Sequence, residues 1–336
     1  MRFGYDEVCL RHDPGPRHPE TPDRLLAIRQ ALEASHGARF ITADPVDHAT
    51  VTSVHDPSYV DLIEETCANG GGQLDQDTVV SEDSWRAART SVGLAIDAAR
   101  AAGHDVDRGA TPFALGRPPG HHAVADRGMG FCIFNNVAVA AQNVIDEGLA
   151  DVVAIVDWDV HHGNGTEAIF YDRSDVPFAS IHEAGLYPGT GPVEETGGDA
   201  GSGATLNIPL QPGATTAAYI QALDRAIEPW LYAHDPDLIL VSAGFDAHEY
   251  DPISRMAVTT EGFGQMTDRL LTMADEMCAG LAFVLEGGYG LDTLSDGVTK
   301  VHEVCHGYEP APEPDTIREP DEAVIDEARS IHGLGS

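Results

Sequence analysis

Short apolar, β-branched runs alternate with longer segments of helical periodicity along most of the chain. The runs at 111–115, 152–156 and 281–285 are typical of strands that are buried on both faces of a parallel sheet. Between such runs, as at 82–102 and 260–278, apolar residues recur at helical spacing. This alternation predicts a mainly parallel sheet of the α/β class, with helices on both faces.

The same pattern extends to both ends of the chain. Further strands are expected at 2–5, 39–42, 176–182, 205–210 and 237–241. Further helices are expected at 22–34, 57–67, 166–171 and 216–233, with two more that end near Ile145 and Cys305. The Gly- and Pro-rich segment 185–203 is too long for a plain connection, so it is expected to have a functional role.

The chain is expected to form one large domain followed by a short tail. Its 336 residues contain no linker that would split residues 1–306 into two units. Residues 307–336 form an acidic, Pro-rich tail, which is expected to lie extended on the surface and to end in a weak helix at about 322–331.

Polar residues follow the apolar run at 152–156 at every second position, as Asp157, Asp159 and His161. Side chains alternate along an extended strand, so these three project to one side. Two carboxylates and an imidazole at a buried strand end are costly unless a cation compensates them, and ligands of open α/β sheets bind at that end. This segment therefore predicts a divalent metal site, the alternative being a polar loop at a strand end.

Other predicted strands also end in polar residues. His121 and His122 stand on a rigid Pro-Pro-Gly turn, Asp246 follows another strand, and Tyr289 follows the last one on a Gly-Gly turn. Taken singly, these residues have ordinary structural explanations as a histidine pair, a helix cap and a turn. Because parallel strands deliver their carboxyl ends to one edge, the joint arrangement predicts a functional site there.

The residue types at this edge suit metal-assisted hydrolysis of an amide or ester. Asp159, His161 and Asp246 would leave positions open on the metal, and this ligand set suits zinc, with Fe(II) as the alternative. Such a metal acidifies a bound water and polarises a carbonyl. His121 and His122 are the candidates for general acid and base. The sequence has no serine or cysteine nucleophile motif.

Three further residues would support this chemistry. Asp157 and Asn164 would hydrogen-bond the outer nitrogens of the two histidines and so set their orientation. Tyr289 would donate its hydroxyl to a developing oxyanion.

The charge balance is strongly acidic. The chain has 55 acidic against 19 basic residues, a net charge of −36, and its only lysine is Lys300. Acidic residues spread along the whole chain, with almost no lysine, suggest adaptation to high salt, as in a halophilic archaeal cytoplasm. The alternative is a negative electrostatic field that attracts cationic substrates, although salt would screen that field. Since there is no basic patch, direct nucleic-acid binding is not expected.

The cysteine content and hydropathy point to a reduced cytoplasmic setting. The 5 cysteines are odd in number and include no Cys-x-x-Cys pair, which argues against a disulfide framework or a structural zinc site. We also find neither a signal peptide nor an apolar run that would span a membrane.

Five motifs, in family order, resemble the histone deacetylase superfamily, which includes acetylpolyamine amidohydrolases and acetoin-utilisation proteins. They are Arg117–His122, Gly130–Asn136, Asp157–Thr166, Ser242–Asp246 and Glu286–Tyr289. The resemblance covers roughly 1–306, and His18-Pro19-Glu20, Trp158 and Asn164 are similar to the class II branch. It implies the arginase/deacetylase fold, with about eight mainly parallel strands.

The resemblance also implies the catalytic roles. Zinc would be held by Asp159, His161 and Asp246. His122 would be the general base, and His121, paired with Asp157, an electrostatic or proton-donating partner. Asn164 stands behind His122 where class I members carry Asp, so His122 should be less biased towards imidazolium. Tyr289 would stabilise the tetrahedral oxyanion.

Bound potassium and the substrate channel are implied in the same way. An inner monovalent site would use Asp157, Asp159, His161, Ser180 and Ile181, and a second would use carbonyls near Phe170, Arg173 and Val176. The acyl-lysine channel would be lined by Gly130, Phe131 and Tyr187, with Asp77 as a rim residue that grips the substrate backbone.

The resemblance leaves the substrate open between acetyl-lysine in proteins and acetylated polyamines. Ile253 occupies the place where eukaryotic polyamine deacetylases carry Glu, and an apolar residue there favours the protein substrate. A non-catalytic acyl-lysine reader is disfavoured by the intact His121, His122 and Tyr289. Arginase-like binuclear manganese chemistry would need further Asp ligands. The oligomeric state, monomer or homodimer, stays open.

Overall fold

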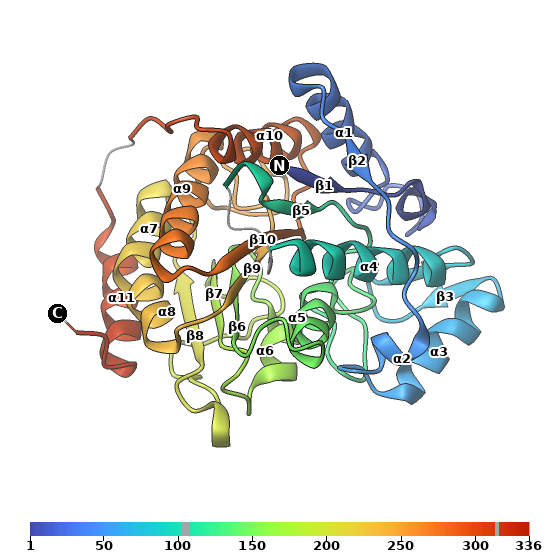
Figure 1. Ribbon diagram of the computed structural model, residues 1–336, viewed down its shortest axis with the longest axis horizontal. Coiled ribbons are helices and arrows are strands. Elements are labelled where there is room, and N and C mark those ends of the chain that lie inside the picture. The colour runs from blue at the N-terminus through green and yellow to red at the C-terminus, as the bar shows by residue number, and fades with distance from the viewer. Residues whose placement is uncertain (103–107, 313–315, 336) are drawn as a thin grey trace.

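A parallel sheet of eight strands runs through the described part of the chain, residues 1–102, 108–312 and 316–335 of this computed structural model (Figure 1). The strands are β1 (Arg2–Gly4), β2 (Phe40–Ile41), β5 (Pro112–Ala114), β6 (Val153–Asp157), β7 (Phe178–Glu183), β8 (Thr205–Leu210), β9 (Leu238–Ala243) and β10 (Gly280–Leu285). Their order is β2-β1-β5-β10-β9-β6-β7-β8, and each neighbouring pair is parallel. The predicted α/β class with a mainly parallel sheet is thus confirmed.

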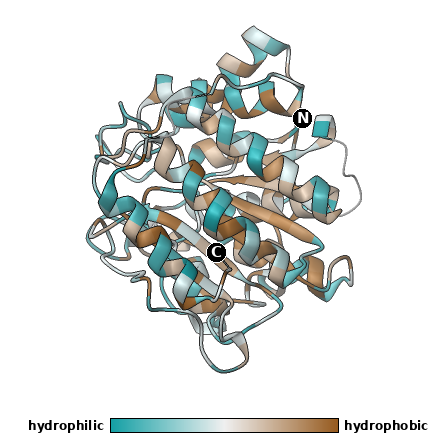
Figure 2. Cartoon of the chain, turned by 90° about the vertical axis from the view of Figure 1, so that its left-hand side faces the viewer, coloured by the Kyte–Doolittle hydropathy of each residue, from teal (hydrophilic) through white to brown (hydrophobic). Residues whose placement is uncertain are grey.

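Two groups of helices enclose the sheet. They are α1 (Asp23–His36), α2 (His48–Val51), α3 (Pro57–Ala68), α4 (Ser84–Ala102), α5 (Asn136–Asp146), α6 (Asn164–Phe170), α7 (Thr216–Ala222), α8 (Glu228–His234), α9 (Thr260–Met277), α10 (Leu291–Cys305) and α11 (Glu319–Ile331). The first group packs α4 against α5 and the sheet, while the second packs α1, α10, α9 and α7 in succession. Figure 2 shows brown, hydrophobic strands between helices with teal, hydrophilic stretches.

Three local features differ from the sequence predictions. Residues 71–81, for which the apolar pattern predicts no strand, form an antiparallel hairpin of β3 (Gly71–Gln73) and β4 (Val79–Ser81). The helix predicted at 216–233 is divided by a π-helical turn, η4 (Leu223–Ile227), between α7 and α8. Helix α11 begins three residues before the predicted 322, and Ile325 and Ala328 are buried in the core.

Part of the predicted tail, residues 313–315 and Ser336, lies outside the described residues. Within the described part, α11 packs against β8, and the buried Asp321 accepts a hydrogen bond from Gln211 N at 2.9 Å. The five cysteines carry free thiols. Among the described residues, we find no helix with the length and apolar character needed to cross a bilayer.

The order of the strands explains how one site gathers side chains from distant segments. The strands that end in polar residues, β5, β10, β9, β6 and β7, are consecutive neighbours in the sheet. All five are buried along their whole length, so their direction and register are fixed by packing on both faces. Their carboxyl ends therefore bring the polar residues to one place at the edge of the sheet.

Candidate active site

Two carboxylates and one imidazole converge where β6 and β9 end. The donor atoms of Asp159, His161 and Asp246 lie within 4.8 Å of one another, and all three residues are buried. His161 Nδ1 is 3.0 Å from Asp159 Oδ1 and 3.3 Å from Asp246 Oδ2. Asp246 Oδ2 is buried and has no hydrogen-bond partner among the described residues. An orphaned carboxylate oxygen next to an N,O donor set fits a divalent cation.

Backbone amides hold the two carboxylates in place. Asp159 Oδ1 accepts from His161 N at 2.9 Å and its Oδ2 from Gly287 N at 2.8 Å, while Asp246 Oδ1 accepts from Val160 N at 2.9 Å. A Cβ atom at Gly287 would lie 2.0 Å from Asp246 Oδ2 and 2.5 Å from Asp159 Oδ2. Only glycine therefore allows the last strand to come this close to both carboxylates.

The pKa values show how strongly these carboxylates favour a positive neighbour. Burial raises the pKa of Asp246, and the Asp159 carboxylate raises it further. Burial also opposes ionisation of Asp159, but attraction from His121 and His161 lowers its pKa. Although burial lowers the pKa of His161, the nearby carboxylates of Asp159 and Asp246 raise it to about 10. The cluster thus takes up a proton that a bound divalent cation would replace.

The two adjacent histidines lie beside this cluster with different partners. His121 Nδ1 is 3.0 Å from Asp157 Oδ2, and His122 Nδ1 is 2.8 Å from Asn164 Oδ1. Burial lowers the pKa of both rings, but Asp159 and Asp157 raise that of His121 to about 10. His122 is held well below its usual pKa by burial and then by the neighbouring His121 and His161. This difference in pKa suits the His121 ring to donate a proton and the His122 ring to accept one.

Asp157 therefore lies apart from the metal donors, although strand periodicity places it with them. Its Oδ2 faces His121, and its Oδ1 accepts from Asp159 N at 3.0 Å.

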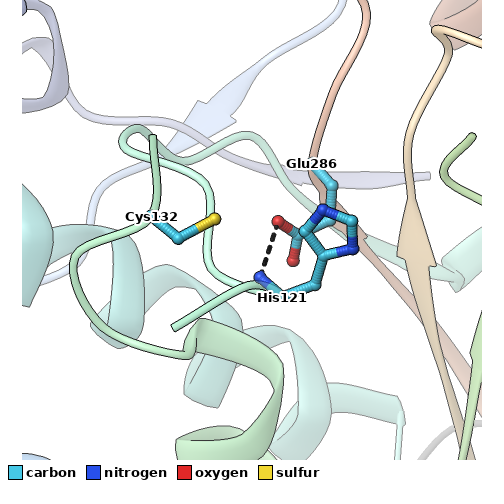
Figure 3. Close-up of side chains that lie close together, drawn as sticks. All are labelled: His121, Cys132 and Glu286. Carbon is cyan, nitrogen blue, oxygen red and sulfur yellow. Dashed lines mark hydrogen bonds between the residues drawn. The ribbon is translucent and has the colours of Figure 1, made fainter. Parts of the chain in front are cut away.

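A glutamate fixes the turn that carries the histidine pair. Glu286 Oε2 accepts from Gly120 N at 2.7 Å and from His121 N at 3.2 Å. Figure 3 shows the second of these contacts, with the Cys132 thiol beside it. His121, Cys132 and Glu286 form a second group of close donors, but burial raises the pKa of Cys132 well above its usual value, so its thiol stays protonated. Sequence reasoning gave Glu286 no role, because its partners are backbone amides more than 160 residues away.

Tyr289 is anchored by two residues that sequence reasoning did not place in the site. Asp251 Oδ2 accepts from Tyr289 N at 2.7 Å and from Gly290 N at 3.1 Å. The Arg24 guanidinium lies over the Tyr289 ring at 5.0 Å, and the Phe131 ring meets its edge at 5.8 Å. Burial raises the pKa of Tyr289 well above its usual value, so the hydroxyl keeps its proton and can donate a hydrogen bond.

The predicted channel residues lie in front of His122. The Tyr187 ring is 5.1 Å from the His122 ring at 88°, and Tyr187 is 37% exposed, so one side of it reaches the surface. A Cβ at Gly130 would lie 2.4 Å from the His122 ring and 2.8 Å from the Tyr187 ring. Gly130 has φ +56° and Phe131 has φ +69°, so the chain turns sharply at these two residues. Gly130 then faces Tyr187, and the Phe131 ring contacts Tyr289.

Asp77 and Ile253 lie on two further loops. Asp77 is in the turn between β3 and β4, where His18 Nε2 is 3.0 Å from its carbonyl oxygen. The next residue, Thr78, accepts from Phe131 N at 3.0 Å, which places this turn beside the channel. Ile253 N donates to Asp251 Oδ1 at 3.0 Å, on the loop that also holds Tyr289.

The residues predicted to bind potassium lie on β6, β7 and the segment between them. Ser180 pairs in register with Asp157, and its hydroxyl is 3.0 Å from His182 Nδ1. Ile181 and Val176 are buried, and Phe170 O accepts from Arg173 N at 2.9 Å in the turn after α6. Both potassium sites stay predictions.

Comparisons with known proteins agree on one family. Residues 18–305 match the histone deacetylase domain family. A histone deacetylase-like amidohydrolase of Pseudomonas aeruginosa is 38% identical, with 85% of this chain and 81% of that protein covered. A probable deacetylase of Archaeoglobus fulgidus is 39% identical, with 86% and 81% covered. The crystal structure of the HDA15 HD domain superimposes with a TM-score of 0.89 at 35% identity, covering 98% of this chain and 93% of that one.

Proposed function

This chain belongs to the histone deacetylase family and has its arginase/deacetylase fold, and from that premise we propose that it is a zinc-dependent hydrolase of acetyl-lysine amides in proteins. The observation that chiefly supports the proposal is the cluster of Asp159, His161 and Asp246, with its unpartnered Asp246 Oδ2. The unequal histidine pair and Tyr289 supply the remaining groups that amide hydrolysis needs.

In this mechanism Asp159, His161 and Asp246 would hold the zinc ion. When bound, zinc supplies a Lewis acid that polarises the amide carbonyl and acidifies water. Since Asn164 Oδ1 can only accept, His122 Nδ1 carries the ring proton, and Nε2 is left to take a proton from the attacking water.

The other groups act on the collapsing amide. His121, kept protonated by Asp157 and Asp159, would deliver a proton to the leaving amine of lysine. The Tyr289 hydroxyl would donate to the carbonyl oxygen as negative charge develops on it. The channel formed by Gly130, Phe131 and Tyr187 would orient the acyl-lysine side chain towards these groups.

The physiological substrate is the open part of the proposal, and acetylated polyamines are the alternative. Ile253, an apolar residue on the loop that also holds Tyr289, gives no carboxylate to pair with a polyamine nitrogen, which supports acetyl-lysine in proteins. The test is the ratio of kcat/KM for an acetyl-lysine peptide to that for acetylspermidine in molar KCl, together with metal content. We expect about one zinc per chain to remain after dialysis and a preference for the peptide.

The other possible results of this kinetic comparison and metal analysis would each support a different assignment. A preference for acetylspermidine would transfer the assignment to the polyamine substrate. Comparably low turnover of both, with peptide binding intact, would favour an acyl-lysine-binding protein without catalysis. Two manganese ions per chain would point to binuclear chemistry.

The partner of His122 gives a pH-dependence prediction. Asn164→Asp would place a carboxylate where the amide oxygen now lies, 2.8 Å from His122 Nδ1. A carboxylate favours imidazolium and should raise the pKa of His122 by about 1 to 3 pH units. Because the base must be neutral, the variant should lose activity at a higher pH than wild type as the solution is acidified. The acidic limb of the kcat/KM profile should therefore move to higher pH. The exposed Asn69→Asp is the control, and an unmoved acidic limb in N164D would contradict the role of His122.

A further inference from the structure

Helix α10 ends in a second set of metal-binding residue types. Its last turn and C-cap read His302-Glu303-Val304-Cys305-His306, the His-Glu-x-x-His spacing that puts two imidazoles on one face of a helix. The helix starts next to Tyr289 and is 15 residues long, so its far end lies roughly 22 Å from its start. Figure 1 shows this end beside the N-terminus, and Met1 N is 3.0 Å from His306 Nε2.

A third histidine comes from the neighbouring helix. His36 is the last residue of α1, and its ring lies 4.7 Å from that of His302, which in turn lies 4.2 Å from that of His306. Glu303 Oε1 is 3.5 Å from His36 Nε2. These four side chains line a surface hollow of about 510 Å³ together with Gly307 and Tyr308.

His302 is prepared to act as a ligand. It is buried, and its Nδ1 has no hydrogen-bond partner among the described residues. The ring also lies between those of His36 and His306 and lines the hollow, so this nitrogen is the free donor atom nearest to both of them. A buried imidazole nitrogen without a partner is costly, and a cation on it would remove that cost.

Backbone electrostatics favour a cation at the same place. Helices α1 and α10 pack against each other, and both end at this hollow. The C-terminal end of a helix carries a partial negative charge, which attracts positive charge. Glu303 adds a full negative charge, although Lys300 Nζ now lies 2.8 Å from it.

We propose that His36, His302 and His306 bind a divalent transition-metal ion, zinc in the first place, with the Glu303 carboxylate as the fourth ligand. Three imidazoles and one carboxylate are an ordinary tetrahedral set for zinc. The donor atoms are not yet within the 4.8 Å that the active-site cluster meets, so binding requires new rotamers for the exposed His36 and His306. The ion would join the ends of α1 and α10, independently of the active site.

The test titrates Zn²⁺ into the holoenzyme after its active-site metal is saturated and the excess removed. Wild type should bind one further ion per chain and unfold at a higher temperature with it. His36→Gln with His306→Gln should weaken this binding by at least the roughly 10- to 100-fold that even outer-shell changes cost. His48→Gln is the matched control, since His48 is a partly exposed histidine on another helix whose Nε2 lies 2.9 Å from Asp61 Oδ1. Deacetylase activity should be the same in all three proteins.

Cobalt gives a second readout that does not depend on stability. Co²⁺ added to the holoenzyme should show the visible absorption of tetrahedral coordination in wild type and His48→Gln, and lose it in the double variant. Equal Zn²⁺ affinity in wild type and the double variant, or no extra ion in wild type, would overturn the proposal. Because His36 and His306 are exposed, both replacements should leave the fold intact.

Discussion

Asp246→Asn is expected to abolish tight zinc binding and to lower kcat/KM for an acetyl-lysine peptide by about three orders of magnitude or more. The Lewis acid contributes several kcal/mol to the barrier, and each 1.4 kcal/mol or so is tenfold in rate. The replacement keeps an oxygen for Val160 N, which now donates to Asp246 Oδ1 at 2.9 Å, so the local fold should remain. Metal content after dialysis and turnover are the measurements, with the exposed Asp296→Asn as control.

Removing the metal should affect the thermal stability of wild type and of D246N differently. The pKa of Asp246 is raised by burial and by Asp159, so without a cation its ionisation destabilises the fold increasingly as the pH rises above the usual carboxyl range. Asparagine carries no such charge. A chelator should therefore lower the Tm of wild type at neutral pH and leave that of D246N unchanged. Retained zinc and near-normal turnover in D246N would refute the proposed ligand set.

Much of the fold could be predicted because most of its strands are buried on both faces. Runs such as 152–156 and 281–285 carry a continuous apolar signal that few other structures share. The hairpin of β3 and β4 carries no such signal, since its two short strands are mostly only partly buried and one contains two glycines. The π-helical turn η4 was equally hidden, because it interrupts a helical pattern without a glycine or proline inside it.

The candidate site was predictable as a set of residue types and less so as a set of contacts. Periodicity alone groups Asp157 with Asp159 and His161, whereas the structure turns Asp157 Oδ2 towards His121 at 3.0 Å. That contact requires the loop after β5 to cross the ends of β10 and β9, which separate β5 from β6 in the sheet, and local sequence does not encode this arrangement. Glu286 and Asp251 act on backbone amides of distant segments, so no side-chain pattern marks them.

Tyr289→Phe is expected to lower kcat by about 10²- to 10³-fold, the usual loss for one oxyanion donor, with little change in KM. The hydroxyl keeps its proton because burial raises its pKa well above the usual value. The ring itself should stay in place, since Asp251 binds the Tyr289 backbone at 2.7 Å and Arg24 and Phe131 contact the ring rather than the hydroxyl.

Metal content and Tm should therefore match wild type in Y289F, which separates lost oxyanion stabilisation from a damaged site. Tyr250→Phe is the matched control, because Tyr250 lies on the neighbouring loop and is 72% exposed. A loss confined to KM would instead mean that Tyr289 binds the ground-state substrate, since only an interaction made in the transition state lowers kcat and kcat/KM together. Unchanged turnover in Y289F would remove the hydroxyl from the mechanism and leave charge stabilisation to the metal and the histidine pair.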